Sequence, residues 1–359
     1  MLLVFAATFV VSSALLFSMQ PLFSKMVLPL LGGTPSVWNT CMVFYQAVLL
    51  AGYAMSHGLI RWLGVKRQAA AQLGILALGF CFLPVAIPPE WVAGAAAMPV
   101  GRLLQLMVMT LGMPLLAISA TAPMLQMWFT QTRHPSARDP YFLYGASNLG
   151  SLAALLGYPL VMEPVLPLPA QTGLWAAGYA LLGGLTFVCA VFVWKTPVSQ
   201  PDSAVEPSVE GYFPTRIPAA LRLRWVMLAM APSALLLGLT TYMTMDIAAV
   251  PLLWVIPLAV YLVTYILAFA RRPWPRPAAI LALQPYLVLP PVFLYFWGGK
   301  IPLLVNLPLH LLAFFVIAMM CHGQLAKSRP DPAHLTEYYL WLSAGGVLKA
   351  PMVATMAAR

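Results

Sequence analysis

The chain has 359 residues, of which 62% are hydrophobic and only 8% charged, and its formal net charge is +10. A soluble domain of this size carries about a quarter charged residues, so the composition excludes a protein whose whole surface faces water. Lipid must cover much of the surface, and we therefore expect an integral membrane protein.

Apolar stretches long enough to cross a bilayer as helices, about 20 residues each, recur along the whole chain. The first set is Leu2–Met19, Val37–Leu59, Ala69–Ile87, Leu103–Phe129, Tyr141–Val161 and Gly173–Trp194. The second set is Trp225–Met245, Pro251–Ala270, Ala279–Trp297, Ile301–Cys321 and Ala333–Met356. The sequence thus predicts an all-α polytopic membrane protein with about 11 transmembrane helices.

Basic residues gather in alternate connections between these stretches. Fourteen of the 19 lie at Arg61/Lys66/Arg67, Arg133/Arg138, Lys195/Arg216/Arg222/Arg224, Arg271/Arg272/Arg276 and Lys327/Arg329. The opposite connections hold only Lys25, Arg102 and Lys300. This is the positive-inside pattern, which places the N-terminus and the basic loops in the cytoplasm. It explains the net charge without a nucleic-acid partner. The first stretch lacks a basic leader and a cleavage site, so we expect it to be retained rather than removed as a signal peptide.

The longest polar stretch, Thr196–Pro218, is rich in Pro, Ser, Asp and Glu and separates the two sets of apolar stretches. It predicts an N-terminal six-helix half over residues 1–195, a cytoplasmic linker over 196–222 and a C-terminal five-helix half over 223–359.

The two halves share short patterns that indicate an internal duplication. The patterns are Ser13-Ala14-Leu15-Leu16 with Ser233-Ala234-Leu235-Leu236, Pro35-x-x-Trp38 and Tyr45 with Pro251-x-x-Trp254 and Tyr261, and Tyr141-Phe142-Leu143-Tyr144 with Tyr338-Tyr339-Leu340-Trp341. A six-plus-six architecture that lacks its twelfth helix accounts for them most simply.

Four segments carry a family resemblance. They are Gln20–Met26 with Leu31–Thr40, Asp139–Ser151, Pro232–Leu235 with Thr240–Ala248, and Cys321–Gly323 with Leu335–Trp341. In this order they resemble the membrane region of bacterial fused proteins that join a major-facilitator-like transmembrane domain to a spermidine-synthase-like domain. The resemblance implies a multi-pass protein of the bacterial inner membrane, whose full-length relatives carry a cytoplasmic aminopropyltransferase-like domain.

The sequence departs from that family near its end. After Ser343–Leu348 the family continues with glycines and further helices, whereas this chain reads Lys349-Ala350-Pro351 and stops at Arg359. It has no glycine-rich nucleotide loop with a downstream acidic partner. We therefore expect a truncated or split member that is not an enzyme by itself and needs no cofactor. Its four cysteines lie within apolar stretches at no metal or redox spacing.

Ionisable and amide groups at membrane depth are costly, so they are the candidate site residues. The substrate-binding candidates are Asp246, Lys25, Gln20, Glu163, His310 and Glu337. On the major-facilitator analogy, Asp246 and Lys25 face each other near the outer mouth, where carboxylates suit a cationic solute such as a polyamine. The alternative is that the two pair as an outer gate or reach interfacial water.

Other polar groups are explained by ion pairing, protonation or helix packing. Glu337 is either a proton relay or, as we favour, the partner of Arg329 or Lys327. His310 is a possible proton site; it cannot share a metal with His322, about 18 Å away along the same helix. Asn148 lies beside small residues at i, i+4 spacing, which favours close helix packing with Asn148 bonding between helices.

Two functions compete. The duplication and the intramembrane carboxylates favour secondary transport of a small, cationic solute. The alternative is a non-transporting membrane subunit or anchor for a separately encoded synthase-like protein or a larger membrane complex, and this alternative predicts a dry, collapsed centre.

Overall fold

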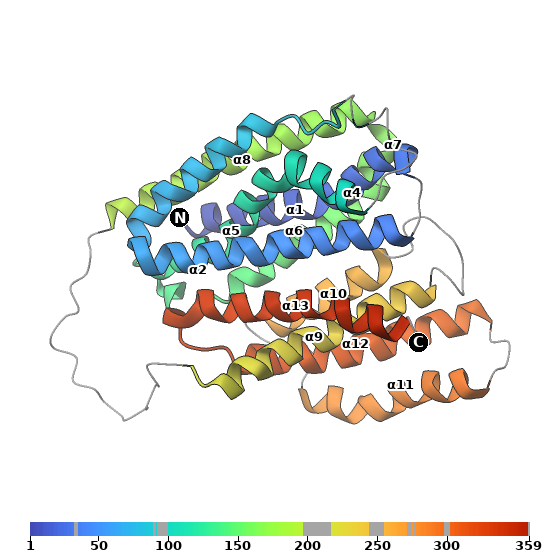
Figure 1. Ribbon diagram of the computed structural model, residues 1–359. Coiled ribbons are helices and arrows are strands. Elements are labelled where there is room, and N and C mark those ends of the chain that lie inside the picture. The colour runs from blue at the N-terminus through green and yellow to red at the C-terminus, as the bar shows by residue number, and fades with distance from the viewer. Residues whose placement is uncertain are drawn as a thin grey trace, which may run out of the picture.

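The structure is a computed structural model that describes residues 1–31, 35–88, 91, 100–196, 217–243, 255–270, 274–275, 277–297 and 302–357. In these segments the regular secondary structure is helical, which confirms the all-α fold class. The helices run side by side in two groups, one coloured blue to green and the other yellow to red (Figure 1).

The N-terminal group contains α1 (Leu2–Leu31), α2 (Pro35–Gly79), α4 (Val100–Met107), α5 (Met113–Thr130), α6 (Phe142–Gly157), α7 (Glu163–Val165) and α8 (Leu168–Lys195). The C-terminal group contains α9 (Ala219–Tyr242), α10 (Val255–Ala268), α11 (Pro277–Trp297), α12 (Leu303–Lys327) and α13 (Leu335–Ala357). One π-helical turn joins α4 to α5 and another joins α6 to α7. The two groups meet where α13 packs on α2 and α10 packs on α6.

Helix α2 contains a turn between two of the predicted stretches. Gly64 has φ +69° and ψ 171°, a backbone conformation that favours glycine. It divides α2 into two helical segments that correspond to Val37–Leu59 and Ala69–Ile87. The Trp194 indole donates to the Lys66 carbonyl oxygen at 2.9 Å, so this turn lies beside the end of α8.

The helices are long and apolar enough for a multi-pass membrane protein. Six described helical stretches meet the length and hydropathy of a membrane span, and α10 and part of α11 are shorter apolar helices. Large apolar side chains remain on the outside, as on Leu160, Phe296 and Leu304, which are 73%, 81% and 88% exposed. Such a surface suits lipid rather than water. The total of 11 crossings stays a prediction.

Close helix contacts hold each group together at corresponding places. A Cβ on Gly150 of α6 would meet the Val10 backbone of α1, and a Cβ on Gly345 of α13 would meet the Val226 carbonyl of α9, each at 2.5 Å. Small residues allow backbones to approach this closely. The close packing predicted for the small residues beside Asn148 is therefore confirmed at Gly150, and the C-terminal group has a similar contact at Gly345.

The basic loops that the structure describes come together at one end of the bundle. Arg133 and Lys195 line a common pocket with Met1. Arg329 pairs with Asp139 at 2.8 Å, which brings the loop before α13 to the same end. Arg271, Arg272 and Arg276 lie outside the described residues. We refer to this end as the basic-loop end.

Candidate functional site

A cavity of about 220 Å³ lies between the two helix groups. Its wall comes from α1, α2, α5 and α6 on one side and from α9, α10 and α13 on the other. Seven serines, six tyrosines, two glutamines and one asparagine supply its polar groups, and no Asp, Glu, Lys, Arg or His of the described residues lines it. The described lining is therefore rich in hydroxyl groups and carries no charged side chain.

Residues that the predicted duplication pairs with each other lie on opposite walls of this cavity. Ser13 on α1 and Ser233 on α9 both line it, as do Tyr45 on α2 and Tyr261 on α10. The two walls differ in their hydrogen bonds. The Ser233 and Tyr261 hydroxyls bond to each other at 2.9 Å, whereas the Ser13 hydroxyl donates within α1 to the Phe9 carbonyl. The Tyr45 hydroxyl is buried and finds no hydrogen-bond partner among the described residues.

A second buried hydroxyl in the wall is also unpartnered. Ser119 on α5 is 2% exposed, and its Oγ has no hydrogen-bond partner within the described part of the chain. Buried polar groups are nearly always hydrogen-bonded, so each exception calls for an explanation. The buried hydroxyl of Tyr339 on α13, which also lines the cavity, is a third without a partner among the described residues. Three such hydroxyls in the wall of one cavity indicate a place where a bound molecule makes the missing bonds.

An aromatic layer closes the cavity toward the basic-loop end. It consists of Tyr53, Tyr141, Tyr144, Tyr265, Tyr338 and Tyr339, whose rings pack edge-on or tilted. Five of these contacts cross between the groups. The shortest are Tyr144 to Tyr339, with ring centroids 5.1 Å apart, Tyr144 to Tyr265 at 5.4 Å, and Tyr141 to Tyr338 at 5.9 Å. Tyr141 and Tyr338 do not line the cavity, so they form the side of the layer away from it.

Polar contacts between the groups lie beyond the aromatic layer. Arg329 donates to the Asp139 carboxylate at 2.8 Å, and the Tyr141 hydroxyl donates to the Pro330 carbonyl at 2.9 Å. The His57 ring on α2 lies 2.9 Å from the Thr336 hydroxyl on α13. Together these contacts join the two groups and close the cavity at the basic-loop end.

The predicted site residues do not converge on this cavity. Gln20 lines it. Lys25 and Glu163 pair with each other at 3.4 Å at the opposite end, both within the N-terminal group. Asp246, which we expected opposite Lys25, lies outside the described residues.

Glu337 forms an ion pair, as expected, but with a different partner. Its carboxylate lies 2.6 Å from Arg222 and 3.7 Å from His334. Arg329, one of the two predicted partners, pairs with Asp139 instead. The prediction was wrong because it considered only basic residues near Glu337 in sequence, whereas packing of α9 on α13 brings Arg222 to it.

The two histidines of α12 occupy separate surroundings. His310 bonds to the Asn306 carbonyl oxygen and packs on Tyr242, with ring centroids 5.0 Å apart. His322 is fully buried, stacks on Tyr265 at 3.6 Å and bonds to Thr264. Within the described residues no group of three His, Cys, Asp or Glu side chains is arranged to hold a metal ion.

Asn148 differs from its expected role. Its amide donates to the Tyr144 carbonyl on its own helix at 2.8 Å rather than to another helix. It also lines the cavity. A residue assigned to packing therefore belongs to the wall of the site.

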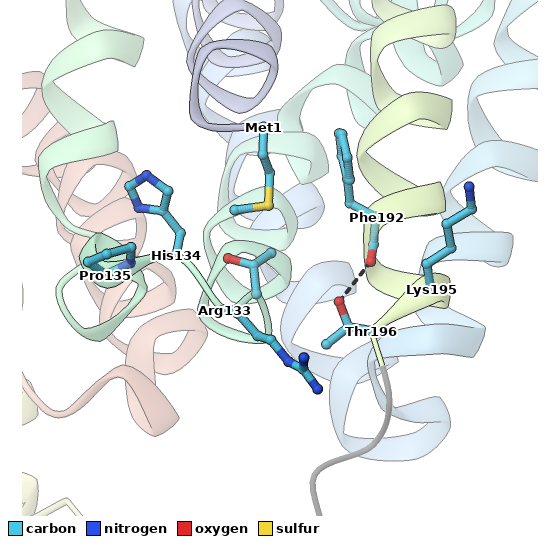
Figure 2. Close-up of a pocket in the computed structure, with 8 residues that line it drawn as sticks. Met1, Arg133, His134, Pro135, Phe192, Lys195 and Thr196 are labelled. Carbon is cyan, nitrogen blue, oxygen red and sulfur yellow. Dashed lines mark hydrogen bonds between the residues drawn. The ribbon is translucent and has the colours of Figure 1, made fainter.

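A second pocket lies at the basic-loop end, beside the N-terminus (Figure 2). Its volume is about 420 Å³, and Arg133, His134, Lys195 and Thr196 are among the residues that line it. The Thr196 hydroxyl donates to the Phe192 carbonyl at 2.8 Å. All the lining residues belong to the N-terminal group, so movement between the groups does not open or close this pocket.

Sequence reasoning missed most of the cavity wall because it searched for ionisable groups. Ser119 and Ser343 resemble ordinary packing residues in an apolar helix. The one usable signal was the duplication, which had already marked Ser13 with Ser233 and Tyr45 with Tyr261.

Comparison with solved structures identifies the fold. The chain is similar to the human organic anion transporter MFSD10, with a TM-score of 0.53 and 15% identity over 97% of this chain and 89% of that one. It is also similar to the proton:xylose symporter XylE bound to 6-bromo-6-deoxy-D-glucose, with a TM-score of 0.54 and 12% identity over 97% of this chain and 86% of that one. A third neighbour is the E. coli fucose:proton symporter FucP, with a TM-score of 0.51 and 16% identity over 98% of this chain and 91% of that one.

These neighbours show that the chain has the fold of major facilitator superfamily transporters, as the sequence predicted. No protein-family model matches the sequence, and neither does any curated protein.

Proposed function

We propose that the chain is a secondary transporter that moves a small solute by alternating access, with the cavity between the helix groups as its binding site. One observation carries this proposal: the cavity takes its wall from both groups, and contacts between the groups close it at one end. A rocking movement that breaks those contacts exposes the same cavity to the other side of the membrane.

The proposal includes an orientation. The basic-loop end faces the cytoplasm of a bacterial inner membrane, since Lys and Arg concentrate in cytoplasmic loops. A cysteine in place of Arg138, an exposed residue at that end, should then react with an impermeant reagent only in inside-out vesicles.

The alternative is a membrane subunit or anchor that holds a separately encoded partner without transporting anything. The resemblance to synthase-fused proteins makes a synthase-like partner the natural candidate. A subunit of this kind was expected to have a collapsed centre, and the cavity of about 220 Å³ argues against it.

Cysteine accessibility tests alternating access without knowledge of the solute. Ser13→Cys is placed in a full chain whose native cysteines (Cys41, Cys81, Cys189 and Cys321) are replaced. We expect an impermeant maleimide to label it in both right-side-out and inside-out vesicles, because the cavity opens to each side in turn. Thr186→Cys, at a fully buried position of α8 outside the cavity, is the matched control and should label from neither side.

Two results would contradict transport: labelling of Ser13→Cys from one side only, or stoichiometric co-purification of a partner together with no labelling from either side. The neighbours' names do not settle the solute, because an organic anion, xylose and fucose differ in charge.

A further inference from the structure

Building on the proposed transport function, we propose that the cavity binds an uncharged solute with several hydroxyl, carbonyl or amide groups, and that Tyr45 and Ser119 hydrogen-bond to it. This differs from the cationic solute that the sequence favoured. Three features of the cavity carry the inference: the charge of its wall, its free hydroxyls and its size.

The described part of the wall offers no counter-charge. Its described polar groups are hydroxyls and amides, and none of the described residues that line it is acidic or basic. A charged solute loses its hydration on entry and regains that energy only if an opposite charge meets it. The tyrosine rings attract cations, but cation–π attraction is weak beside the cost of burying an unpaired ion. The cavity therefore favours a molecule without net charge.

The free hydroxyls point to a hydrogen-bonding solute rather than an apolar one. On the C-terminal wall Ser233 and Tyr261 satisfy each other, while the Tyr339 hydroxyl is buried without a partner among the described residues. On the opposite wall Tyr45 is buried with no partner among the described residues, as is the Ser119 hydroxyl. A hydroxyl both donates and accepts, so these two groups suit a molecule with both kinds of group. An apolar solute would leave them unpaired at a cost in affinity.

The size limits the solute to a small molecule. A cavity of about 220 Å³ holds several water molecules and has room for a small organic molecule. A solute that replaces those waters needs several polar groups to replace their hydrogen bonds. Small polyols, sugars and amides meet both conditions.

The test uses the purified full chain in lipid nanodiscs and measures saturable binding calorimetrically. The uncharged probes are D-xylose, D-glucose, myo-inositol, glycerol and nicotinamide; putrescine and spermidine are the cations, and lactate and citrate the anions. We expect at least one uncharged probe to bind and the charged probes not to compete with it. Tyr45→Phe and Ser119→Ala should each weaken that binding roughly three- to tenfold, the effect of one neutral hydrogen bond.

Matched controls separate loss of a ligand contact from general damage. Tyr286→Phe, at an exposed position of α11, and Ser18→Ala, on α1 outside the cavity, should leave the affinity unchanged. The melting temperature of unliganded Tyr45→Phe should not fall, because the deleted hydroxyl has no described protein partner to lose. A fall would mean that the hydroxyl serves the fold.

Two results would overturn the inference: saturable binding of putrescine or spermidine that Asp246→Asn abolishes, or no binding by any uncharged probe. Labelling of Ser13→Cys from both sides can persist in either case, so a wrong solute class is distinguishable from failure of the transport proposal. Loss of that labelling pattern instead counts against transport itself.

Discussion

The two parts of the interface between the helix groups use opposite chemistry. At the basic-loop end the groups are joined by an ion pair, Asp139 with Arg329, whose side chains are 56% and 36% exposed. In the cavity the described lining carries no charged side chain, and most of its hydroxyl-bearing residues are buried. Charge costs little where water reaches it and much where water does not. The comparison suggests that charged groups control the position of the helix groups while neutral groups bind the solute.

Two ion pairs sharpen this comparison because they resemble each other but differ in what they join. Asp139–Arg329 spans the two groups, whereas Lys25–Glu163 lies within the N-terminal group. A perturbation of the first pair should affect movement between the groups. The same perturbation of the second pair should not, so it serves as the control.

The largest effect is expected from a covalent link across the basic-loop end. Cysteines replace Asp139 and Arg329 in the Ser13→Cys chain, and a short bifunctional thiol reagent links them. The Ser13→Cys thiol is protected until this link is made. The link should abolish labelling of Ser13→Cys from the basic-loop side. The link prevents that end from opening, so the cavity stays reachable from the other side alone. Cysteines at Lys25 and Glu163, linked in the same way, should leave labelling from both sides intact. Equal effects of the two links would contradict the proposal that only the Asp139–Arg329 pair controls movement between the groups.

A charge placed in the cavity should be the next most damaging change. Ser119→Asp puts a carboxylate at a site that is 2% exposed, and desolvation of an unpaired ion costs several kcal/mol. We expect thermal unfolding of this variant to begin far lower at neutral pH and to recover partly in acid, where the carboxyl is neutral. Ser119→Asn, similar in size but uncharged, should be much milder. Equal losses for both would attribute the effect to size.

Overpacking within a group should be intermediate and independent of charge. Gly150→Val and Gly345→Val push a side chain into the backbone of α1 or α9, because even a Cβ would lie 2.5 Å from a carbonyl oxygen there. Such overpacking costs about 1–3 kcal/mol, which a denaturant titration of the purified chain would detect. Gly157→Val is the control, since an added Cβ at that position would have no atom of another helix within 4 Å. If all three variants behave alike, the groups are not held by these close contacts.

Removal of the charges at the basic-loop end should have the smallest effect. Asp139→Asn or Arg329→Gln deletes an exposed ion pair, worth at most about 1 kcal/mol. The labelling rate of Ser13→Cys from that end should rise up to about fivefold, and the exchanged pair Asp139→Arg with Arg329→Asp should restore it. Lys25→Gln should not change the rate. A faster rate in Lys25→Gln would show that the opposite-end pair also controls movement.

Much of the architecture was predictable because helix period, span length and loop charge are local properties. The basic residues Arg61, Lys66 and Arg67 marked a connection between two spans, where the structure has a turn at Gly64. Pairings across the bundle were not predictable. Glu337 lies near Arg329 in sequence but pairs with Arg222, because α9 packs on α13.

The candidate site was harder to predict, since the cost of burying charge drew attention to Lys25, Glu163 and Asp246 and away from hydroxyls. Serine and tyrosine in an apolar helix usually bond to their own backbone or pack, as Ser13 does. Only the three-dimensional arrangement shows that Tyr45 and Ser119 lack partners among the described residues. The duplication was the sequence signal that came nearest to the cavity.

Movement between the helix groups is tested most directly by electron-spin distance measurements at both ends of the bundle. One pair of spin labels replaces Arg138 and Lys327 at the basic-loop end, and a second replaces Leu28 and Leu304 at the opposite end, all four exposed. We predict two populations of distances for each pair of labels. When solute or lipid changes the ratio of the two populations, the long distance at one end should increase together with the short distance at the other end. A single, unchanging distance at both ends would contradict alternating access.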